Sequence, residues 1–365
     1  MRSIKILTVV GARPQFIKAS VISRLINKSF KHIEEIIIHT GQHYDSNMSD
    51  VFFNELEITK PKYILNINNA NHGQMVGRML EELEKIFLKE NPDCILVYGD
   101  TNSTLAGGLA GKKLGIKVAH IEAGVRNYDE RMPEEVNRYL VDRLADFNFC
   151  CTELGYFNLI KEGYEDPQLN KSIFLSGDVM YESAQFSITK KQTIEATTQN
   201  ILNKKEDFIL VTIHRPSNTD SEGVLLKIID GLNKLNQEKN IIFLCHPRTR
   251  TRLEKFKIVP DFQLYQPMGY FDTLNLIKAS SLVITDSGGL VREAYFFQKK
   301  SLFLLANPVW PELIDAGACI NIDPLLEDIL DGYNTLKSKN VNWSDLIFGD
   351  GTAGSKILEE LSKAL

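Results

Sequence analysis

Two acidic side chains follow buried strands of the sequence, at the points where these strands end. Asp100 comes shortly after the apolar run 94–97, and Glu122 follows the run 117–121. A helix of small residues, 103–114, is predicted between the two strands. Strand, turn, helix and strand form one βαβ unit, so both strands end at the same edge of a parallel sheet. Open α/β sheets bind ligands at this edge. We therefore expect two neighbouring carboxylates at a site for proton transfer.

More charged residues follow in the sequence. Pro133 is typical of a first helical residue, which puts Glu134 and Glu135 in the first turn of a helix. Arg126 and Arg131 lie in the preceding loop. The segment therefore predicts an acid-rich reaction site bordered by cations.

The start of the chain predicts a second part of this site. A buried strand over 4–10 ends in Gly11-Ala12-Arg13-Pro14, and an amphipathic helix follows. Such a glycine turn often holds a phosphate, which makes Arg13 and Lys18 candidate anion contacts. A solvated pair at a helix start is an equally good interpretation. The motif GxGxxG is absent, so a dinucleotide is only weakly indicated.

The second half of the chain carries its own candidate residues. Ser287-Gly288-Gly289 lies between a strand and a helix, where backbone N–H groups and the helix N-terminus favour a phosphate. Glu293, one turn further on, is a candidate acceptor for a ribose diol. His214 and His246 each follow a predicted strand, and two histidines in matching positions favour a functional role over a structural one.

The order of these elements predicts an α/β protein with two doubly wound, Rossmann-like domains and a cleft between them. Composition breaks after residue 176, and a strand-and-helix pattern begins again at residue 208. We therefore place the first domain at 1–176 and the second at 177–351, with 352–365 packing back on the first.

Composition excludes several functional classes. The chain has 365 residues and a net charge of −5, which gives no reason to expect a nucleic acid or an anionic membrane as partner. It has five cysteines without CxxC spacing, as in a reduced cytoplasmic protein. No apolar run is long enough to span a membrane, no cluster has the spacing of metal ligands, and no signal peptide is predicted.

The chain resembles the non-hydrolysing UDP-N-acetylglucosamine 2-epimerases over nearly its whole length. The matching segments are Gly11–Pro14, Gly41–His43, Gly99–Thr101, Glu122–Arg126, Pro133–Arg138, His214–Arg215 and Asp286–Gly289, with Glu293. Each segment alone is weak, but together and in this order they are specific.

The resemblance implies a glycosyltransferase-B-like fold, a homodimer, and a reaction without cofactor or metal. It implies that UDP-GlcNAc and UDP-ManNAc interconvert, for surface polysaccharide synthesis, through elimination of UDP to a 2-acetamidoglucal and re-addition. The implied catalytic residues are Asp100, Glu122, Glu134 and His214. The implied UDP-sugar contacts are Arg13, Lys18, Arg126, Arg138, His246, Ser287, Gly288, Gly289 and Glu293. Gln42 and His43 match contacts to a second, regulatory UDP-GlcNAc.

Some positions depart from the family pattern. Gln15 stands where many UDP-GlcNAc enzymes have glutamate, and Trp310-Pro311-Glu312 lacks a preceding arginine. These features look closer to the subgroup that acts on UDP-2,3-diacetamido-glucuronic acid. Two other functions remain open: a hydrolysing 2-epimerase that releases UDP and ManNAc, and a glycosyltransferase with the same fold. Sequence alone leaves open which carboxylate is the base.

Overall fold

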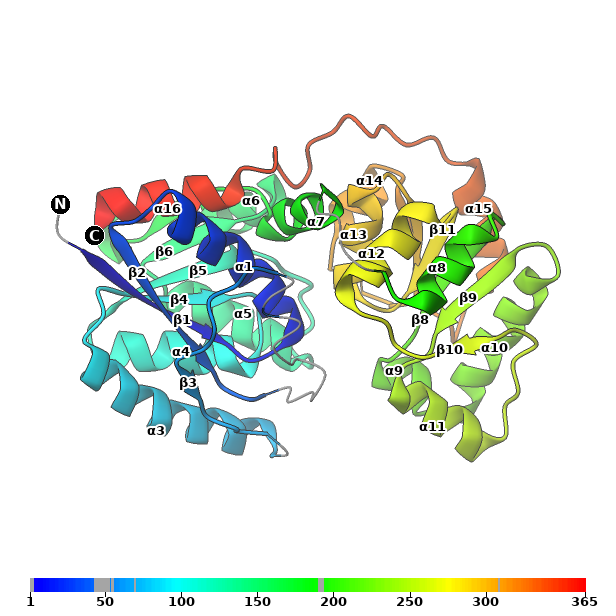
Figure 1. Cartoon of the computed structure of the whole chain (residues 1–365), viewed down its shortest axis with the longest axis horizontal. Helices are drawn as coiled ribbons and strands as arrows, with labels where there is room; N and C mark the ends of the chain where they lie inside the picture. The colour runs from blue at the N-terminus through cyan, green and yellow to red at the C-terminus, as the bar shows by residue number, and fades with distance from the viewer. Residues whose placement is uncertain (1–2, 43–52, 54–55, 69, 190–193, 308) are drawn as a thin grey trace. The chain divides into compact units, whose positions relative to one another are not determined.

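A computed structural model of the chain describes residues 3–42, 53, 56–68, 70–189, 194–307 and 309–365 (Figure 1). His43, one of the two expected regulatory contacts, lies outside these residues. The chain forms two compact units: unit 1 comprises Met1–Gln185 with Leu346–Leu365, and unit 2 comprises Phe186–Asp345.

The chain passes from unit 1 to unit 2 after Gln185, within a helix. The sequence had placed this boundary at residue 176. This helix, α7 (Val179–Thr189), begins in unit 1 because its first turn is bonded to the returning C-terminal segment. The backbone N of Asp178 donates to Phe348 O at 2.9 Å, and Glu182 accepts from the backbone N of Gly354 at 2.8 Å.

Unit 1 contains a seven-stranded sheet in the order β3-β2-β1-β4-β5-β6-β7, in which all neighbouring strands pair in parallel. The strands are β1 (Ile4–Val10), β2 (Ile33–His39), β3 (Tyr63–Ile64), β4 (Cys94–Tyr98), β5 (Lys117–Ala123), β6 (Phe147–Cys150) and β7 (Ser172–Leu175). The four central strands β2, β1, β4 and β5 are mostly buried, as expected for strands covered on both faces. The chain order changes direction between β1 and β4, which makes the ends of these strands the switch point of the sheet.

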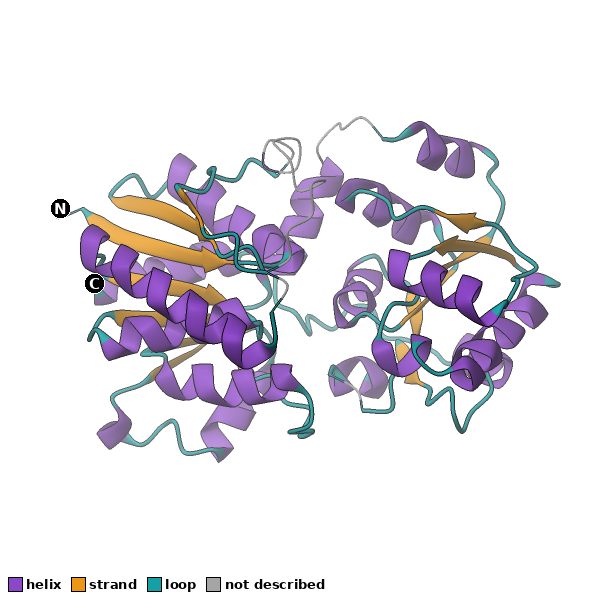
Figure 2. Cartoon of the chain, turned by 90° about the horizontal axis from the view of Figure 1, so that it is seen from below, coloured by secondary structure: helices purple, strands orange, loops and turns teal. Residues whose placement is uncertain are grey.

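Helices cover both faces of this sheet (Figure 2). They are α1 (Arg13–Lys28), α3 (His72–Glu90), α4 (Asn102–Lys113), α5 (Pro133–Leu144), α6 (Glu153–Lys161), the 3₁₀ helix Pro167–Leu169 and α16 (Ala353–Ala364). Apolar side chains of α3, α4 and α5 pack with alternate residues of β1, β2 and β4 in one core, to which Val9, Met79 and Val141 belong. The C-terminal helix α16 lies beside α1 in unit 1 (Figure 1).

Unit 2 contains a six-stranded parallel sheet in the order β10-β9-β8-β11-β12-β13. The strands are β8 (Phe208–Thr212), β9 (Asn240–Leu244), β10 (Leu264–Tyr265), β11 (Leu282–Thr285), β12 (Lys300–Phe303) and β13 (Cys319–Asn321). The helices are α8 (Ala196–Asn203), α9 (Pro216–Thr219), α10 (Glu222–Asn236), α11 (Pro247–Phe256), α12 (Tyr270–Ala279), α13 (Gly288–Phe296), α14 (Pro311–Asp315) and α15 (Ile329–Ser338). The switch point lies between β8 and β11. The predicted α/β class with two parallel sheets is therefore confirmed.

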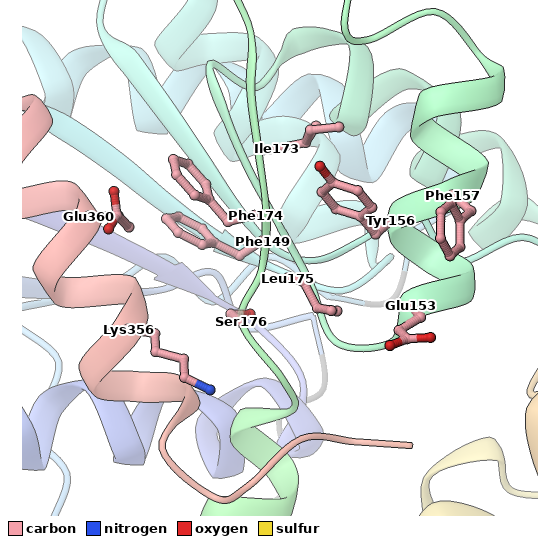
Figure 3. Close-up of a pocket in the computed structure, with 10 residues that line it drawn as sticks. All are labelled: Phe149, Glu153, Tyr156, Phe157, Ile173, Phe174, Leu175, Ser176, Lys356 and Glu360. Atoms are coloured by element: carbon pink, nitrogen blue, oxygen red, sulfur yellow. The ribbon is translucent and has the colours of Figure 1, made fainter. Parts of the chain in front are cut away.

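Unit 1 also has a pocket of about 510 Å³ at its edge strand β7 (Figure 3). Its lining includes Phe149 and Phe174, whose stacked rings have centroids 5.1 Å apart. None of the residues that line it is among the predicted site residues. Among the described residues, no helix is both long and apolar enough to cross a membrane.

Candidate active site

Asp100 lies just beyond β4, at the switch point of unit 1. The preceding Gly99 has a φ of 62°, the left-handed conformation that turns the chain after the strand. Arg138 of α5 donates from Nε and Nη2 to Asp100 Oδ2, at 3.0 and 2.6 Å. The Asp100 side chain is 26% exposed, whereas that of Arg138 is 6% exposed. Asp100 is therefore an accessible carboxylate with a buried cation behind it.

Glu122 lies at the end of the neighbouring strand, β5, in an unusual backbone conformation. Its φ is 75°, and the pairing of β5 with β6 shifts register at this point. A left-handed non-glycine residue is costly, and such strain concentrates at functional sites. Lys18 of α1 lies 2.7 Å from the Glu122 carboxylate, and both side chains are almost fully buried.

The turns that carry Asp100 and Glu122 lie against each other. A Cβ atom added to Gly99 would lie 3.2 Å from Lys18 Nζ and 3.4 Å from Glu122 Oε1. The backbone N of Gly99 also donates to Ile121 O at 2.9 Å. The structure therefore brings together the two turns that carry the expected carboxylates, and each carboxylate pairs with its own cation. Lys18 and Arg138, expected as substrate contacts, are bonded to these carboxylates.

The first turn of α5 separates its two glutamates. Glu134 is exposed, whereas Glu135 is fully buried. Glu135 accepts from Arg138 at 2.7 Å and from the backbone N–H groups of Asn127 and Tyr128 at 3.1 and 2.9 Å. Glu134 is therefore the glutamate of this pair that is open to a ligand, and Glu135 holds the loop before the helix.

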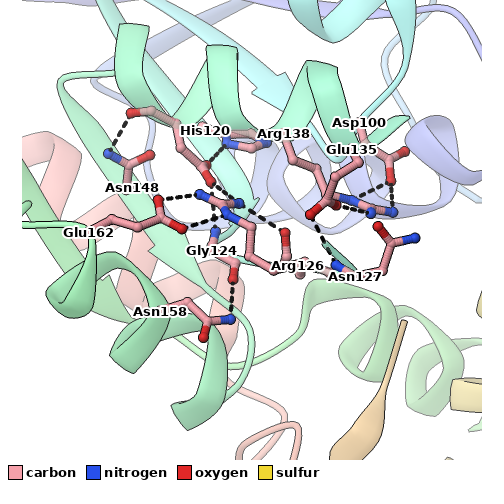
Figure 4. Close-up of polar contacts among 12 residues, drawn as sticks. Asp100, His120, Gly124, Arg126, Asn127, Glu135, Arg138, Asn148, Asn158 and Glu162 are labelled. Atoms are coloured by element: carbon pink, nitrogen blue, oxygen red, sulfur yellow. Dashed lines mark hydrogen bonds and ion pairs between the residues drawn. The ribbon is translucent and has the colours of Figure 1, made fainter. Parts of the chain in front are cut away.

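Arg126 lies inside unit 1 and not at its surface (Figure 4). Its guanidinium has no exposed area and bonds to Asp142, Glu162 and Val125 O at 2.7–2.9 Å. The expected contact between Arg126 and the substrate finds no support in this arrangement. A buried arginine bonded to two carboxylates is an internal ion pair.

The turn after β1 carries Arg13, which is half-buried at the first position of α1. Gln15, two residues later, is completely bonded within the protein. It accepts from the backbone N of Gly11 and Ala12 and donates to Tyr98 O and Thr104 Oγ1, all at 2.8–3.1 Å. Gln15 thus connects the ends of β1 and β4 across the switch point.

Gln42, the described member of the expected regulatory pair, contacts the start of α4. Its Oε1 accepts from the backbone N and the hydroxyl of Ser103, at 3.1 and 2.8 Å.

His214 follows β8, at the switch point of unit 2, and is paired with Asp286, which follows β11. Their Nδ1 and Oδ1 atoms are 2.9 Å apart. Asp286 is completely buried and also accepts from the backbone N of His214 and Arg215 and from Asn218 Nδ2. Burial alone would raise the pKa of Asp286, but the bonds to His214 and to the backbone lower it below its ordinary value. An ionised Asp286 therefore fixes the position of a histidine whose side chain is 41% exposed.

The Ser287-Gly288-Gly289 segment forms the start of α13, as expected. Ser287 caps the helix by accepting from Leu290 N, at 3.4 Å. Trp310 Nε1 donates to Gly288 O at 3.0 Å, so one edge of the turn is fixed by an aromatic side chain. Glu293 is 3% exposed.

His246 lies beside His214, with ring centroids 5.7 Å apart. Burial and the neighbouring His214 lower the pKa of His246, which favours its neutral form. No group of three or more His, Cys, Asp or Glu side chains in the described part of the chain has an arrangement that suits a metal ion.

Sequence reasoning missed the roles of four residues, namely Gln15, Glu135, Asp142 and Asp286. Glu135, Arg138 and Asp142 recur at intervals of three and four residues, which places them on one face of α5. That spacing is a signal for a charged helix face turned towards the sheet. Asp286 stood directly before the Ser-Gly-Gly segment but was given no role.

Comparison with known proteins agrees with this geometry. A family model described as UDP-N-acetylglucosamine 2-epimerase matches residues 26–362. A UDP-2,3-diacetamido-2,3-dideoxy-D-glucuronate 2-epimerase from Pseudomonas aeruginosa is 44% identical over 98% of this chain and 99% of its own length. A UDP-N-acetylglucosamine 2-epimerase from Methanococcus maripaludis is 40% identical over 97% of each chain.

A solved structure has the same fold. The UDP-GlcNAc 2-epimerase of Methanocaldococcus jannaschii, in complex with UDP-GlcNAc and UDP, aligns with a TM-score of 0.88 at 37% identity, over 99% of this chain and 100% of that chain. The chain described here therefore belongs to the non-hydrolysing UDP-N-acetylglucosamine 2-epimerase family and is an isomerase, a UDP-sugar 2-epimerase.

Proposed function

We propose that the enzyme inverts C2 of a UDP-2-acetamido sugar, with the acid–base groups in unit 1 and the UDP site in unit 2. The observation that supports this most strongly is the pair of adjoining turns with Asp100 and Glu122. Two carboxylates with separate cations suit a reaction that removes a proton from one face of a carbon atom and returns one to the other.

The proposed reaction has two balanced steps. A carboxylate removes the proton from C2, the electron pair forms the C1–C2 double bond, and the bond between C1 and the UDP oxygen breaks. The products are a 2-acetamidoglucal and UDP. In the second step UDP re-adds to C1, and a proton is delivered to the opposite face of C2. Asp100, Glu122 and Glu134 are the proposed proton carriers of unit 1.

Departure of UDP requires stabilisation of the charge that develops on its β-phosphate. In unit 2 the proposed groups are the N–H groups of Ser287, Gly288 and Gly289 at the start of α13, with His214 beside them. Because Asp286 holds Nδ1 of His214, the other ring nitrogen is available to the phosphate or to a proton. Arg13, His246 and Glu293 complete the proposed set of UDP-sugar contacts.

Two substrates are consistent with this chemistry. UDP-GlcNAc is named for several relatives, and a UDP-2,3-diacetamido-glucuronate is named for the Pseudomonas relative. With UDP-GlcNAc as substrate, the proposed product is UDP-ManNAc. The second is favoured by the Gly-Ala-Arg-Pro-Gln and Trp-Pro-Glu segments. The homodimer implied by the resemblance and the cytoplasmic location indicated by the cysteines are part of this proposal. Sedimentation analysis tests the homodimer.

The test is proton NMR of the purified enzyme with each UDP-sugar in D₂O. Epimerisation places deuterium at C2 and gives a UDP-linked product, whereas a hydrolysing enzyme releases the free amino sugar. Asp100→Asn and Glu122→Gln should each lower turnover by about 10²- to 10⁴-fold. UDP affinity should change little in both variants. Near-normal turnover in both would contradict the assignment of these carboxylates.

A further inference from the structure

A network of charged side chains in unit 1 includes His120, Arg126 and Glu162 (Figure 4). It joins Asp142 of α5 to His120 of β5, and through Arg126 to Glu162 at the end of α6. The side chains of His120, Arg126 and Asp142 have no exposed area. None of the three is therefore placed to contact the substrate.

Asp142 is the centre of this network. Its Oδ1 lies 2.7 Å from His120 Nδ1, and its Oδ2 accepts from Arg126 Nη1 at 2.7 Å and from the backbone N of Gly124 at 3.1 Å. Burial would raise the pKa of Asp142, but the hydrogen bonds and charges of His120 and Arg126 lower it below its ordinary value. Asp142 is therefore ionised and fully bonded.

The contacts of Asp142 reach both turns. Gly124, bonded directly, is two residues beyond Glu122. His120 continues the connection, because its Nε2 lies 2.7 Å from the carbonyl oxygen of Gly99, the residue before Asp100. Both ring nitrogens of His120 thus lie within hydrogen-bond distance of an acceptor atom.

We propose that Asp142 is a positioning residue for the C2 epimerisation, because it holds the Gly99–Asp100 turn and the Glu122–Gly124 turn at a fixed separation. This inference rests on the proposed function. Fixed separation matters because a proton must leave one face of C2 and return to the other, and a displacement of about 1 Å at such groups costs about 10²-fold in rate.

Asp146 provides a matched control at the other end of β5. It is also buried, accepts from Lys112 and Lys117, and accepts from the backbone N of Val118 at 3.0 Å. Asp146 therefore supports the same strand with the same kind of bonds, but at the edge of the sheet away from Asp100 and Glu122.

The experiment compares Asp142→Ala, Asp142→Asn and Asp146→Ala. In Asp142→Asn the side-chain oxygen can still accept from Gly124 and Arg126, and the side-chain amide can donate to His120 Nδ1. Unfolding midpoints establish which variants are folded at the assay temperature. kcat and KM then follow from the NMR assay, and hydrogen exchange of segments 99–101 and 122–126 reports on the two turns.

We expect Asp142→Ala to lower kcat by about 10²-fold with little change in KM, and to speed exchange in both segments. Asp142→Asn should recover kcat to within about tenfold of the wild type. Asp146→Ala should lower the unfolding midpoint but leave kcat within about threefold.

A folded Asp142→Ala enzyme with wild-type kcat would overturn the proposal, as would equal losses of kcat in Asp142→Ala and Asp146→Ala. If Asp142→Ala does not fold, an Asp142→Asn enzyme whose kcat is not recovered despite a wild-type midpoint would overturn it too. If the wild-type enzyme turns over neither UDP-sugar, the proposed function fails, and the hydrogen-exchange comparison still tests whether Asp142 fixes the two turns.

Discussion

Lys18 Nζ lies 2.7 Å from Glu122 Oε2, and both side chains are at least nine-tenths buried. A buried ion pair of this kind is costly to break from one side, because the remaining charge stays in a poorly solvated place.

The pair can be tested with a double-mutant cycle. Lys18→Met and Glu122→Gln should each lower the free energy of unfolding, by up to about 3–5 kcal/mol for a pair of this burial. The double variant should lose clearly less than the sum of the two, because neither charge is then left alone. Urea unfolding measures all three variants. Additive losses would show that the two groups are not coupled.

Gln15→Glu should destabilise unit 1. The side-chain amide donates to Tyr98 O and Thr104 Oγ1, and a carboxylate places an acceptor against the Tyr98 carbonyl. We expect a loss of about 1–3 kcal/mol in the free energy of unfolding. Gln168→Glu, at an exposed position, is the control and should change little. Equal stability of the two variants would contradict the bonding described for Gln15.

Glu35 makes stability depend on pH. Burial raises the pKa of its carboxyl from 4.5 to about 7, and Oε2 has no hydrogen-bond partner among the described residues. Between these two pH values the folded state keeps a proton that the unfolded state has lost. Glu35 therefore costs stability as the pH rises through this range, and the cost is complete above about pH 7.

Glu35→Gln removes this titration. We compare the unfolding midpoint of the variant with that of the wild type at pH 5 and at pH 8. The variant's advantage over the wild type should be larger at pH 8. The control is Glu34→Gln, at the exposed neighbouring residue. The gap in unfolding midpoint between Glu34→Gln and the wild type should be the same at both pH values. A constant gap between Glu35→Gln and wild type at both pH values would contradict the prediction.

Asp286→Asn should impair turnover more than folding. An amide nitrogen in place of Oδ1 donates to His214 Nδ1, which moves the ring proton to the other nitrogen, while the remaining oxygen keeps its bonds to the backbone. If His214 carries a proton in the reaction, kcat should fall by about 10²- to 10⁴-fold, with UDP affinity nearly unchanged. Asp272→Asn, at another buried aspartate of unit 2, is the control. Unchanged kcat in Asp286→Asn would remove His214 from the proton-transfer steps.

Gly288→Ala separates folding from nucleotide binding. An added Cβ would lie 3.5 Å from Trp310 Nε1, an ordinary contact, so the unfolding midpoint should stay the same. The same Cβ blocks the close approach of a phosphate to the backbone, and UDP affinity should fall by about tenfold or more. Gly223→Ala in α10 has open space around it and should leave both values unchanged. Calorimetry with UDP decides; wild-type affinity in Gly288→Ala would exclude this turn as the phosphate site.

The sequence by itself determined the α/β class, the two sheets and the adjoining turns that carry Asp100 and Glu122. Most residues of each central strand are apolar, and a glycine or a polar turn follows the strand. Parallel strands with helical connections have their carboxyl ends at one edge, so the sequence positions of Asp100, Glu122, His214 and Ser287 already placed them there.

Only the tertiary structure decided which charges pair with which. Lys18 pairs with Glu122, Arg138 joins Asp100 to Glu135, and Arg126 is buried against Asp142, although all three cations had been expected to contact the substrate. These ion pairs join side chains of α1 and α5 to residues at strand ends that are far away in the sequence. They therefore depend on how each helix packs on the sheet. The periodicity of a helix shows which residues share a face, but the packing of that face decides which charges are buried together.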